Sequence, residues 1–260
     1  STLLASSAAS DVYKRQLSYH TVSGETRALS HISFHLMPGE FLAVVGPSGC
    51  GKSTLLNLVC GLLSAEEGTI LMNDTAPSPG DPRIGYMLQK DHLLEWRTIY
   101  QNVTLGLEIR RELTPAKLKY IEEMLCTYGL DKFRNARPSQ LSGGMRQRAA
   151  LIRTLALKPE LLLLDEPFSA LDYQTRLNVS DDIGRILKKE RKPAILVTHD
   201  ISEAISMADR VIILTKRPAT VARIVTIDLG LTDRTPLSSR NAPQFKSYFN
   251  LIWKELNQYV

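Results

Sequence analysis

Residues Gly46–Ser53 read GPSGCGKS, which matches the spacing GxxxxGK[ST]. The segment follows an apolar run at 41–45 and precedes a helical pattern, the context in which such a loop binds phosphate. The glycines let backbone N–H groups turn toward an anion, and the helix N-terminus adds partial positive charge. Lys52 is then expected to reach the β- and γ-phosphates of a nucleotide, and the Ser53 hydroxyl to bind Mg²⁺. A glycine-rich turn that matches the pattern by chance is the alternative.

Two adjacent carboxylates, Asp165 and Glu166, follow the apolar run at 161–164 and precede Pro167. On its own, an Asp after a leucine strand is most simply a turn or helix-cap residue, and Glu166 is a plain exposed side chain. With a phosphate loop in the same chain, Asp165 becomes a candidate for the magnesium-side carboxylate. Glu166 becomes a candidate to orient or deprotonate an attacking water, and Pro167 is expected to hold it in an extended conformation.

Two more polar residues end apolar runs: His199 follows 194–198, and Gln89 follows 84–88. A lone histidine at the end of a strand is usually structural, and a glutamine there is uninformative by its type alone. The carboxyl ends of parallel strands, however, form the ligand crevice of an open α/β sheet. We therefore expect His199 at that crevice.

A second candidate anion site lies at 141–148, which reads LSGGMRQR. Ser142 can cap a helix that starts at Gly143, and the pair Gly143 and Gly144 allows close backbone approach to an anion. A capped helix with a glycine hinge explains Ser-Gly-Gly alone, but not the whole set of residues in this order.

The elements that must position these residues alternate between strand and helix from Leu17 onward. Alternation of this kind predicts a mostly parallel α/β sheet. The purely helical stretch near 99–157 breaks the alternation and predicts a separate helical subdomain. The expected strands are 32–36, 41–45, 69–72, 83–88, 160–164, 194–198 and 210–214, and the expected helices are 52–62, 99–110, 115–128, 143–157, 173–190, 201–208 and 243–258.

Composition sets outer limits on function. The chain has 260 residues, 43% hydrophobic and 23% charged, which suits one large globular domain or two small ones. A net charge of +5 without a basic cluster argues against a nucleic-acid partner. Cys50, Cys60 and Cys126 form no CxxC pair, which favours a reduced intracellular chain without a zinc module. No run approaches about 18 apolar residues, so no membrane span is predicted, and the Ser/Ala-rich start is interpreted as a non-native or disordered tail at 1–16.

Taken in chain order, these segments resemble the ABC-type ATPases over Leu17 to about Leu214. The resemblance implies the ABC ATPase fold, an α/β P-loop NTPase core with a mostly parallel sheet, an N-terminal antiparallel β portion and an inserted helical subdomain. In that interpretation 17–260 is a single domain, with the nucleotide-binding core at 17–90 and 158–260 and the helical subdomain at 91–157. The matching motifs are the phosphate loop at 46–54, the Q-loop glutamine Gln89, the signature at 141–147, the D-loop at 169–172 and the switch histidine His199.

The resemblance also implies roles for single residues. ATP is bound and hydrolysed with Mg²⁺, the adenine stacks on Tyr19, and the metal lies at Ser53, Gln89 and Asp165. The catalytic residues are Glu166, His199 and Gln89. The ATP-binding residues of one chain are Tyr19, Gly46, Pro47, Ser48, Gly49, Cys50, Gly51, Lys52, Ser53, Thr54 and Asp165, and a second copy in a head-to-tail dimer supplies Ser142, Gly143, Gly144 and Asp172.

Within the family, the chain resembles importer ATPases of the nitrate/sulfonate/taurine type, and the segments that carry this likeness are 46–54, 95–98, 165–172 and 197–204. The likeness implies an ATPase that energises uptake of a small solute, together with separate transmembrane permease subunits and, indirectly, an extracytoplasmic solute-binding protein. Such a subunit lies at the cytoplasmic face of a bacterial or archaeal inner membrane. The stretch His92–Thr98 is expected to contact the permease. Leu93, Leu94 and Trp96 either form that socket or anchor the loop on its own subdomain.

Two other classes stay open at this point. A soluble, non-transport ABC ATPase of translation, repair or iron–sulfur assembly would share the motifs. Translation factors of this kind usually carry two cassettes, and repair ATPases carry long coiled coils, which this sequence does not show. A P-loop kinase or GTPase would leave the segment at 141–147 unexplained. The transported solute is not encoded in this chain, because a binding protein and a permease select it.

Overall fold

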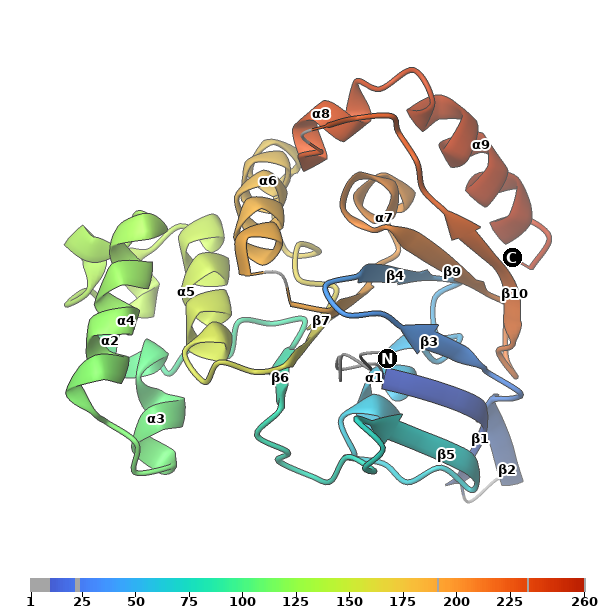
Figure 1. Cartoon of the computed structure of the whole chain (residues 1–260), viewed down its shortest axis with the longest axis horizontal. Helices are drawn as coiled ribbons and strands as arrows, with labels where there is room; N and C mark the ends of the chain where they lie inside the picture. Colours follow the sequence, from blue (N-terminus) through green and yellow to red (C-terminus); the bar gives the residue numbers. More distant parts are fainter. Residues whose placement is uncertain (1–9, 22–23, 191, 233, 260) are drawn as a thin grey trace, which may run out of the picture.

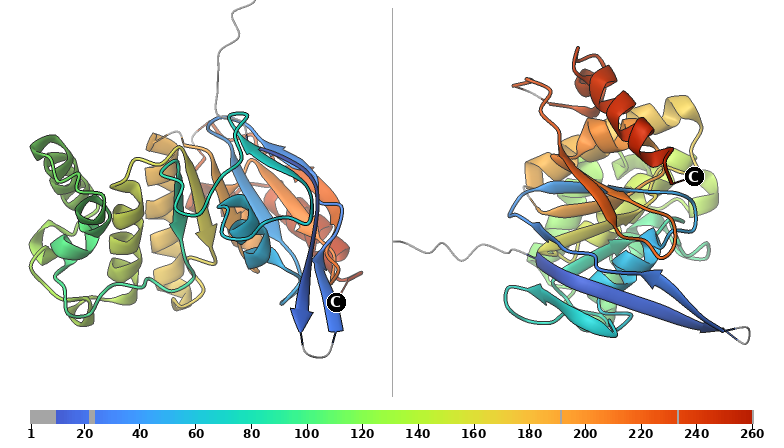
Figure 2. Two further views of the ribbon diagram at one scale, coloured as in Figure 1. Left: turned by 90° about the horizontal axis from the view of Figure 1, so that it is seen from below. Right: turned by 90° about the vertical axis from the view of Figure 1, so that its right-hand side faces the viewer.

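The structure is a computed structural model that describes residues 10–21, 24–190, 192–232 and 234–259. Two β-sheets lie next to each other with helices around them (Figure 1). A group of helices between residues 99 and 155 projects to one side of the sheets, as both Figure 1 and Figure 2 show.

The larger sheet has the strand order β10-β9-β4-β8-β7-β6 among the described residues. Its strands are β4 (Phe41–Val45), β6 (Ile84–Met87), β7 (Leu161–Asp165), β8 (Ala194–Val197), β9 (Arg210–Leu214) and β10 (Val221–Thr226). All neighbouring pairs are parallel except β10 with β9. Parallel pairing places the carboxyl ends of β4, β8, β7 and β6 at one edge of the sheet, and each candidate residue that follows one of these strands lies there.

The smaller sheet is antiparallel and confirms the expected N-terminal β portion. Here β1 (Ser10–Thr21) pairs with β2 (Gly24–Leu29), β3 (Phe34–Leu36) and β5 (Glu67–Met72). Residues 10–16 are therefore part of the fold, and their interpretation as a tail outside it is wrong. The cause is long-range pairing, since Val12 lies opposite both Phe34 and Ile70, and local composition does not reveal such partners. Residues 1–9 lie outside the described part of the chain.

The helices begin and end close to their expected positions, with one division and one addition. The helices are α1 (Lys52–Val59), α2 (Ile99–Val103), α3 (Leu105–Ile109), α4 (Pro115–Thr127), α5 (Gly143–Leu155), α6 (Tyr173–Glu190), α7 (Ile201–Met207), α8 (Pro236–Arg240) and α9 (Phe245–Leu256), with 3₁₀ turns at Asp131–Phe133 and Pro138–Gln140. The helix expected at 99–110 is divided into α2 and α3, which meet at Thr104. The Thr104 hydroxyl donates to the Tyr100 carbonyl at 2.9 Å, a local bond of the kind that bends helices. The short helix α8 is not predicted by the sequence. No described helix has the length and apolar content that a membrane span needs.

The two faces of the large sheet enter different hydrophobic cores. In β7, Leu162 and Leu164 pack with α5 and α6, whereas Leu161 and Leu163 pack with α1. Next to the first core, α7 and α9 cover β4 and β9. Because strand side chains alternate between faces, α1 and α5 lie on opposite sides of β7. Burial on both faces also explains why these strands read as continuous apolar runs.

The projecting helices share one hydrophobic core with α6 and one face of β7. Ile99, Val103 and Leu107 are fully buried in this core, together with Leu151 of α5. Helix α5 contacts α2, α3 and α4 on one side and α6 and β6 on the other. Helix α5 therefore connects the projecting helices to the sheet. The expected subdomain boundary at residue 157 stays a prediction.

Candidate functional site

The segment Gly46–Ser53 connects β4 to α1 at the carboxyl edge of the large sheet. Gly49 and Gly51 have positive φ angles of 72° and 120°. At Gly51 a β-carbon would also lie 2.8 Å from Leu29 Cδ2, so a larger residue there would displace its neighbour. The Cys50 side chain is buried, which raises the pKa of its thiol. The loop therefore offers its backbone, and not the thiol, to a ligand.

The charge of this loop comes from Lys52, the first residue of α1. Its Nζ donates to the carbonyl oxygens of Gly46 at 2.9 Å and Pro47 at 3.0 Å, so the buried side chain folds back across the loop. Ser48 is exposed, whereas Thr54 is buried behind the loop. An anion that approaches the exposed side of the loop meets backbone N–H groups, a helix N-terminus and an ammonium group.

Asp165 ends β7 with a buried side chain beside Ser53. The Ser53 hydroxyl donates to Asp165 Oδ1 at 3.2 Å. The Tyr86 hydroxyl lies 3.4 Å from Asp165 Oδ2 and 3.2 Å from Asn57 Oδ1. Burial raises the pKa of Asp165, with a further contribution from the charge of Glu166, and the hydrogen bonds from Ser53 and Tyr86 oppose this rise. The sequence does not single out Tyr86 or Asn57, because nothing in the type or spacing of either residue marks it.

The pair Ser53 and Asp165 fits a Mg²⁺ ion. A hydroxyl and a carboxylate are hard oxygen ligands, and Mg²⁺ takes one or two carboxylates together with waters and substrate phosphates. A cation beside Asp165 would offset the burial that raises the pKa of this residue. Gln89, the third residue expected at the metal, donates through its Nε2 to Glu166 and Ser169.

Glu166 occupies a tight turn directly after β7. Its φ of 44° is in the left-handed region, so the expectation of an extended conformation before Pro167 is wrong. Hydrogen bonds determine the turn: Glu166 N donates to Val197 O at 2.8 Å, and Ser169 donates to Glu166 O from its backbone N at 3.1 Å and its Oγ at 3.0 Å. Such a conformation costs about 1–3 kcal/mol and persists where the surroundings over-determine it, often at functional sites.

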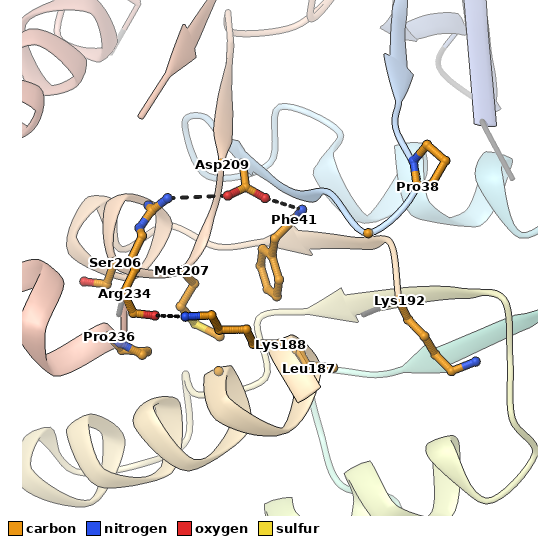
Figure 3. Close-up of a pocket in the computed structure, with 12 residues that line it drawn as sticks. Pro38, Phe41, Leu187, Lys188, Lys192, Ser206, Met207, Asp209, Arg234 and Pro236 are labelled. Carbon is orange, nitrogen blue, oxygen red and sulfur yellow. Dashed lines mark hydrogen bonds and ion pairs between the residues drawn. The ribbon is translucent and has the colours of Figure 1, made fainter. Parts of the chain in front are cut away.

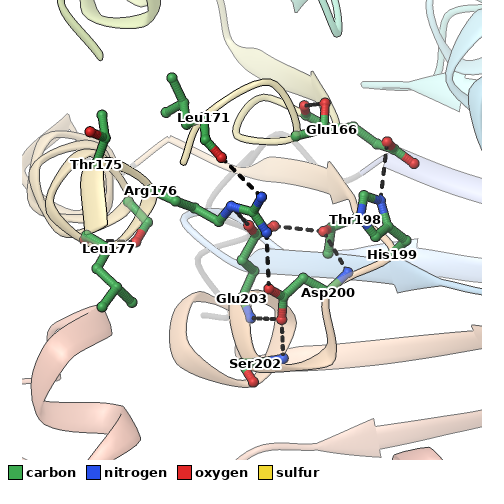
Figure 4. A network of polar contacts seen from close by, with 12 residues as sticks. Glu166, Leu171, Thr175, Arg176, Leu177, Thr198, His199, Asp200, Ser202 and Glu203 are labelled. Atoms are coloured by element: carbon green, nitrogen blue, oxygen red, sulfur yellow. Dashed lines mark hydrogen bonds and ion pairs between the residues drawn. The ribbon is translucent and has the colours of Figure 1, made fainter. Parts of the chain in front are cut away.

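The Glu166 carboxylate meets two of the other expected residues. Its Oε2 lies 3.2 Å from His199 Nδ1 (Figure 4) and accepts from Gln89 Nε2 at 3.3 Å. The three residues follow β8, β7 and β6, which are neighbours in the sheet. The His199 side chain is half exposed, and Glu166 is mostly buried. One carboxylate oxygen is thus fixed by two partners beside the Ser53–Asp165 pair, an arrangement that suits a general base.

The signature segment caps α5 on the other side of the sheet from the phosphate loop. Ser142 Oγ accepts from Met145 N at 3.4 Å. Ser142 and Gly143 are exposed, but Gly144 is buried. A β-carbon on Gly144 would lie 2.7 Å from Val179 Cγ2 of α6. Close packing of α5 on α6 therefore requires glycine at this position, independently of any anion.

Two expected residues remain, Asp172 and Tyr19. Asp172 caps α6, because its Oδ1 accepts from Thr175 N at 3.0 Å, and hydrogen bonding to Thr175 lowers the pKa of Asp172. The D-loop also packs on the signature segment, since a β-carbon on Gly143 would lie 3.0 Å from Leu171 Cδ2. The Tyr19 backbone pairs with Thr26 in the antiparallel sheet, and its side chain lies outside what the structure describes.

A cavity of about 500 Å³ lies at the opposite, amino edge of the large sheet (Figure 3). Its lining includes Phe41, Asp209 and Arg234, and none of the residues expected from the sequence. Asp209 Oδ2 accepts from Phe41 N at 2.8 Å, and Arg234 donates to Ile205 O and Ala208 O at the end of α7. These charged side chains satisfy the ends of a strand and a helix, so they have a structural role.

Known proteins match this chain along most of its length. The family described as ABC transporter matches residues 29–169. The chain is 46% identical to the uncharacterized ABC transporter ATP-binding protein YtlC of Bacillus subtilis, over 92% of each chain. It is 38% identical to the aliphatic sulfonates import ATP-binding protein SsuB of Bacillus licheniformis, over 90% of this chain and 88% of that one. It is 39% identical to the nitrate transport protein NasD of Klebsiella oxytoca, over 81% of this chain and 82% of that one.

A solved structure shares the fold. The dimeric post-hydrolysis state of the ATP-binding cassette MJ0796 bound to ADP and Pi is similar to this chain with a TM-score of 0.73 and 29% identity, over 84% of this chain and 99% of that chain. This likeness confirms the expected architecture of a mostly parallel core, an antiparallel β portion and added helices. The chain therefore belongs to the ABC transporter family and is an ABC-type ATPase, a subunit of the kind that couples ATP hydrolysis to transport.

Proposed function

We propose that this chain energises an importer for a small solute of the nitrate, sulfonate or taurine type. Similarity along most of the chain to proteins named for sulfonate import and nitrate transport supports the importer assignment. One observation supports the site of hydrolysis: the Glu166 carboxylate is held by His199 and Gln89 at the sheet edge that carries the phosphate loop.

ATP binds with its phosphates on the backbone of the loop at 46–53. In the structure Lys52 Nζ is bonded to two loop carbonyls, and in the ATP-bound protein it exchanges these for phosphate oxygens. The exchange is favourable because hydrogen bonds between charged groups are stronger than those to neutral carbonyls. Mg²⁺, when held by Ser53 and Asp165, would neutralise part of the negative charge on the phosphates.

Hydrolysis is an attack of water on the γ-phosphorus. A bond forms between the water oxygen and phosphorus, the bond from phosphorus to the β–γ bridging oxygen breaks, and ADP leaves with the electron pair. Glu166 accepts the proton of the attacking water. His199 and Gln89 hold Oε2 of this carboxylate in place, so the proton transfers to Oε1.

A second copy of the chain completes the site in this proposal. Helix α5 lies on the opposite face of β7 from α1, so its exposed N-terminus is available to another molecule. In a head-to-tail dimer Ser142, Gly143, Gly144 and Asp172 of one copy meet the ATP bound to the other. The dimeric cassette with bound ADP and Pi supports this arrangement.

A separate permease is the proposed membrane partner, and the loop His92–Thr98, which follows Asp91, is the proposed contact. Ion pairs fix this loop on α5, because Arg146 lies 2.8 Å from both Asp91 and Glu95. Arg153 donates to the carbonyls of Asp91 at 2.6 Å and His92 at 2.7 Å. In this proposal, a permease that displaces the loop also displaces α5, and with it the signature segment at the start of α5.

The sequence leaves open whether the apolar residues of this loop contact the permease or anchor the loop on its own subdomain, and the structure differs from residue to residue. Leu93 is buried, at 6% exposure, and anchors the loop in the core of the projecting helices. Leu94 is half-buried, with its backbone bonded to the side chain of Asn102. Trp96 is 71% exposed. We therefore assign Trp96 to the permease contact. In this proposal the protein lies at the cytoplasmic face of the membrane.

Reconstitution into liposomes with a permease that co-purifies with this chain, and with a matching solute-binding protein, tests the proposal. We expect solute uptake that depends on ATP, and ATP hydrolysis that rises when the binding protein carries its solute. Nitrate, taurine and an alkanesulfonate are compared as solutes, and a complex with Glu166→Gln is the control that assembles without uptake. A rate of ATP hydrolysis that is the same with and without the permease, but that changes when RNA or DNA binds in a salt titration, would instead support a soluble ABC ATPase.

A further inference from the structure

A network of buried and half-buried polar side chains joins the first turn of α6 to the loop after β8 and to α7 (Figure 4). Arg176 of α6 lies 3.6 Å from Asp200, between its Nη1 and Oδ2, and 3.9 Å from Glu203, between its Nε and Oε1. The Thr198 hydroxyl donates to Glu203 Oε2 at 2.6 Å. The Glu203 side chain is only 4% exposed. These contacts connect three elements that are distant in sequence.

The two ends of this network lie beside residues of the proposed ATPase site. At one end, Arg176 Nη2 donates to the Leu171 carbonyl at 3.1 Å, one residue before Asp172 of the D-loop. At the other end, Thr198 and Asp200 flank His199, and Asp200 N donates to Thr198 Oγ1 at 3.0 Å. His199 in turn contacts Glu166. The network therefore connects the D-loop, which in the proposed dimer meets the ATP bound to the second copy, with the histidine that holds Glu166.

The central contact of the network is incomplete in this structure. Arg176 Nε is buried and has no hydrogen-bond acceptor among the described residues, although Glu203 Oε1 lies 3.9 Å away. A movement of about 1 Å would convert this loose ion pair into a charge-assisted hydrogen bond. Arg176 also bonds the carbonyl of Leu171, so a small shift of the D-loop is the kind of movement that would bring the pair closer.

The charge of Glu203 is sensitive to that shift. Burial raises the pKa of Glu203 to about 7, and the bond from Thr198 lowers it. Of the charged groups that face Glu203, Asp200 raises this pKa, whereas Arg176 and His199 lower it. Closer approach of Arg176 would lower it further, so tightening of the pair favours the charged carboxylate.

We propose that Arg176 and Glu203 are positioning residues that transmit the position of the D-loop backbone to the loop that carries His199. When a second copy shifts Leu171 and Asp172, Arg176 moves with them and closes on Glu203. The charged Glu203 then holds Thr198, and with it the backbone of His199, in the arrangement that orients Glu166. This inference rests on the proposed roles of Glu166 and His199 and adds the means by which they respond to the second copy.

Steady-state kinetics on the full chain test the proposal with Glu203→Gln, Arg176→Lys and the double variant. Glu203→Gln keeps an acceptor for Thr198 but removes the charge, and we expect a fall in kcat of about tenfold at pH about 8, with KM for ATP unchanged. The wild-type kcat/KM rises as the pH passes through about 7, the pKa of Glu203 in the ATP-free protein, and this rise is absent from Glu203→Gln. The double variant is no slower than the slower single variant, because both changes break one connection.

A matched control is Arg185→Lys, which alters an arginine on the same helix that pairs with Asp181 within α6. Its kcat and pH profile should equal those of the wild type. If the network only fastens α6 to α7, Glu203→Gln and Arg176→Lys lower kcat additively and in proportion to their loss of thermal stability, with wild-type pH profiles. That result overturns the proposal while leaving the roles of Glu166 and His199 intact.

A second measurement does not depend on turnover. In the Glu166→Gln background, ATP addition should release protons near pH about 7 as Glu203 becomes charged, measured by calorimetry in buffers of different ionisation enthalpy. The same experiment with Glu166→Gln and Glu203→Gln combined should show less release. Equal proton release from both proteins contradicts the proposal even if the wild-type chain hydrolyses no ATP, a result that would separately contradict the proposed catalytic roles.

Discussion

Glu166 Oε2 lies 3.2 Å from His199 Nδ1, between residues that follow the neighbouring parallel strands β7 and β8. The same oxygen accepts from Gln89, which follows β6 on the other side of β7. Strand pairing brings these three side chains together, since each lies within two residues of the end of its strand. A charged Glu166 assigns the proton of the His199 ring to Nδ1, because only a protonated nitrogen donates to a carboxylate. The Nε2 of the neutral ring is then an acceptor, so it donates to a γ-phosphate oxygen only when the ring carries a second proton.

The role of Glu166 leads to the first prediction. Glu166→Gln keeps the shape of the side chain but removes the basic oxygen, and the loss of a positioned general base costs about 10²–10⁴ in rate. We expect kcat to fall by this factor while ATP still binds and a closed dimer accumulates. Single-turnover hydrolysis and size-exclusion chromatography with ATP measure the two effects. Glu160→Gln, at an exposed residue just before β7, is the control. Near-normal turnover of Glu166→Gln would refute the role of Glu166.

The separation of the two anion sites leads to a second prediction. Lys52→Ala removes the ammonium group that crosses the phosphate loop, so nucleotide affinity of the single chain should fall. Ser142→Arg leaves that loop intact and blocks the γ-phosphate bound to the second copy. This variant should bind ATP as a monomer with wild-type affinity but lose hydrolysis. Fluorescent-nucleotide binding and ATPase assays compare them, and an equal loss of affinity in both variants would contradict a signature that acts on the second copy.

The edge of the site could be predicted because its signals are local. Apolar runs that end in Gly46, Asp165 and His199 are visible in the sequence, and parallel pairing of the runs brings their ends together. The helix caps at Ser142 and Asp172 are local in the same sense. The roles assigned to these residues remain predictions, and Ser142→Arg tests one of them.

What could not be predicted depends on contacts between distant segments. In β10 only Val225 is buried, so this edge strand has no apolar run that would reveal it. The left-handed turn at Glu166 depends on a bond to Val197 of the next strand, which overrides the local effect of Pro167. The place of Tyr86 beside Asp165 depends on the pairing of β6 with β7. Gly144 suggests an anion site by its type, but its packing on α6 is visible only in the fold.

The contrast between Trp96 and Leu93 leads to a third prediction. Trp96 is exposed, so Trp96→Ala should leave thermal stability and the ATPase of the free cassette nearly unchanged. It should sharply reduce co-purification with the permease and solute uptake, because truncation of an aromatic anchor at an interface often costs about 2 kcal/mol or more. Leu93→Ala, in the core, should instead destabilise the fold by about 2–5 kcal/mol. If Trp96→Ala loses stability and free ATPase in proportion to transport, Trp96 is a core residue and the permease contact lies elsewhere.

The burial of Glu203 leads to a prediction about stability and pH. Its pKa in the folded protein is about 7, raised from 4.5 chiefly by burial, so between these values the folded state keeps a proton that the unfolded state has released. The contribution of this group to stability is therefore complete below pH about 4.5, falls as the pH rises, and is lost above pH about 7. The difference in pKa corresponds to about 3 kcal/mol across the whole interval.

Urea unfolding of the wild type and Glu203→Gln between pH about 5 and 8 measures this effect. Glutamine does not titrate, so the free energy of unfolding of the wild type should fall relative to that of the variant as the pH rises, by about 2–3 kcal/mol. Subtracting the two curves removes the titration of all other groups. Glu123→Gln, which removes an exposed carboxylate on α4, should give a constant difference from the wild type. A constant difference for Glu203→Gln as well would show that Glu203 is charged throughout this range, and the loose contact with Arg176 would then not govern its charge.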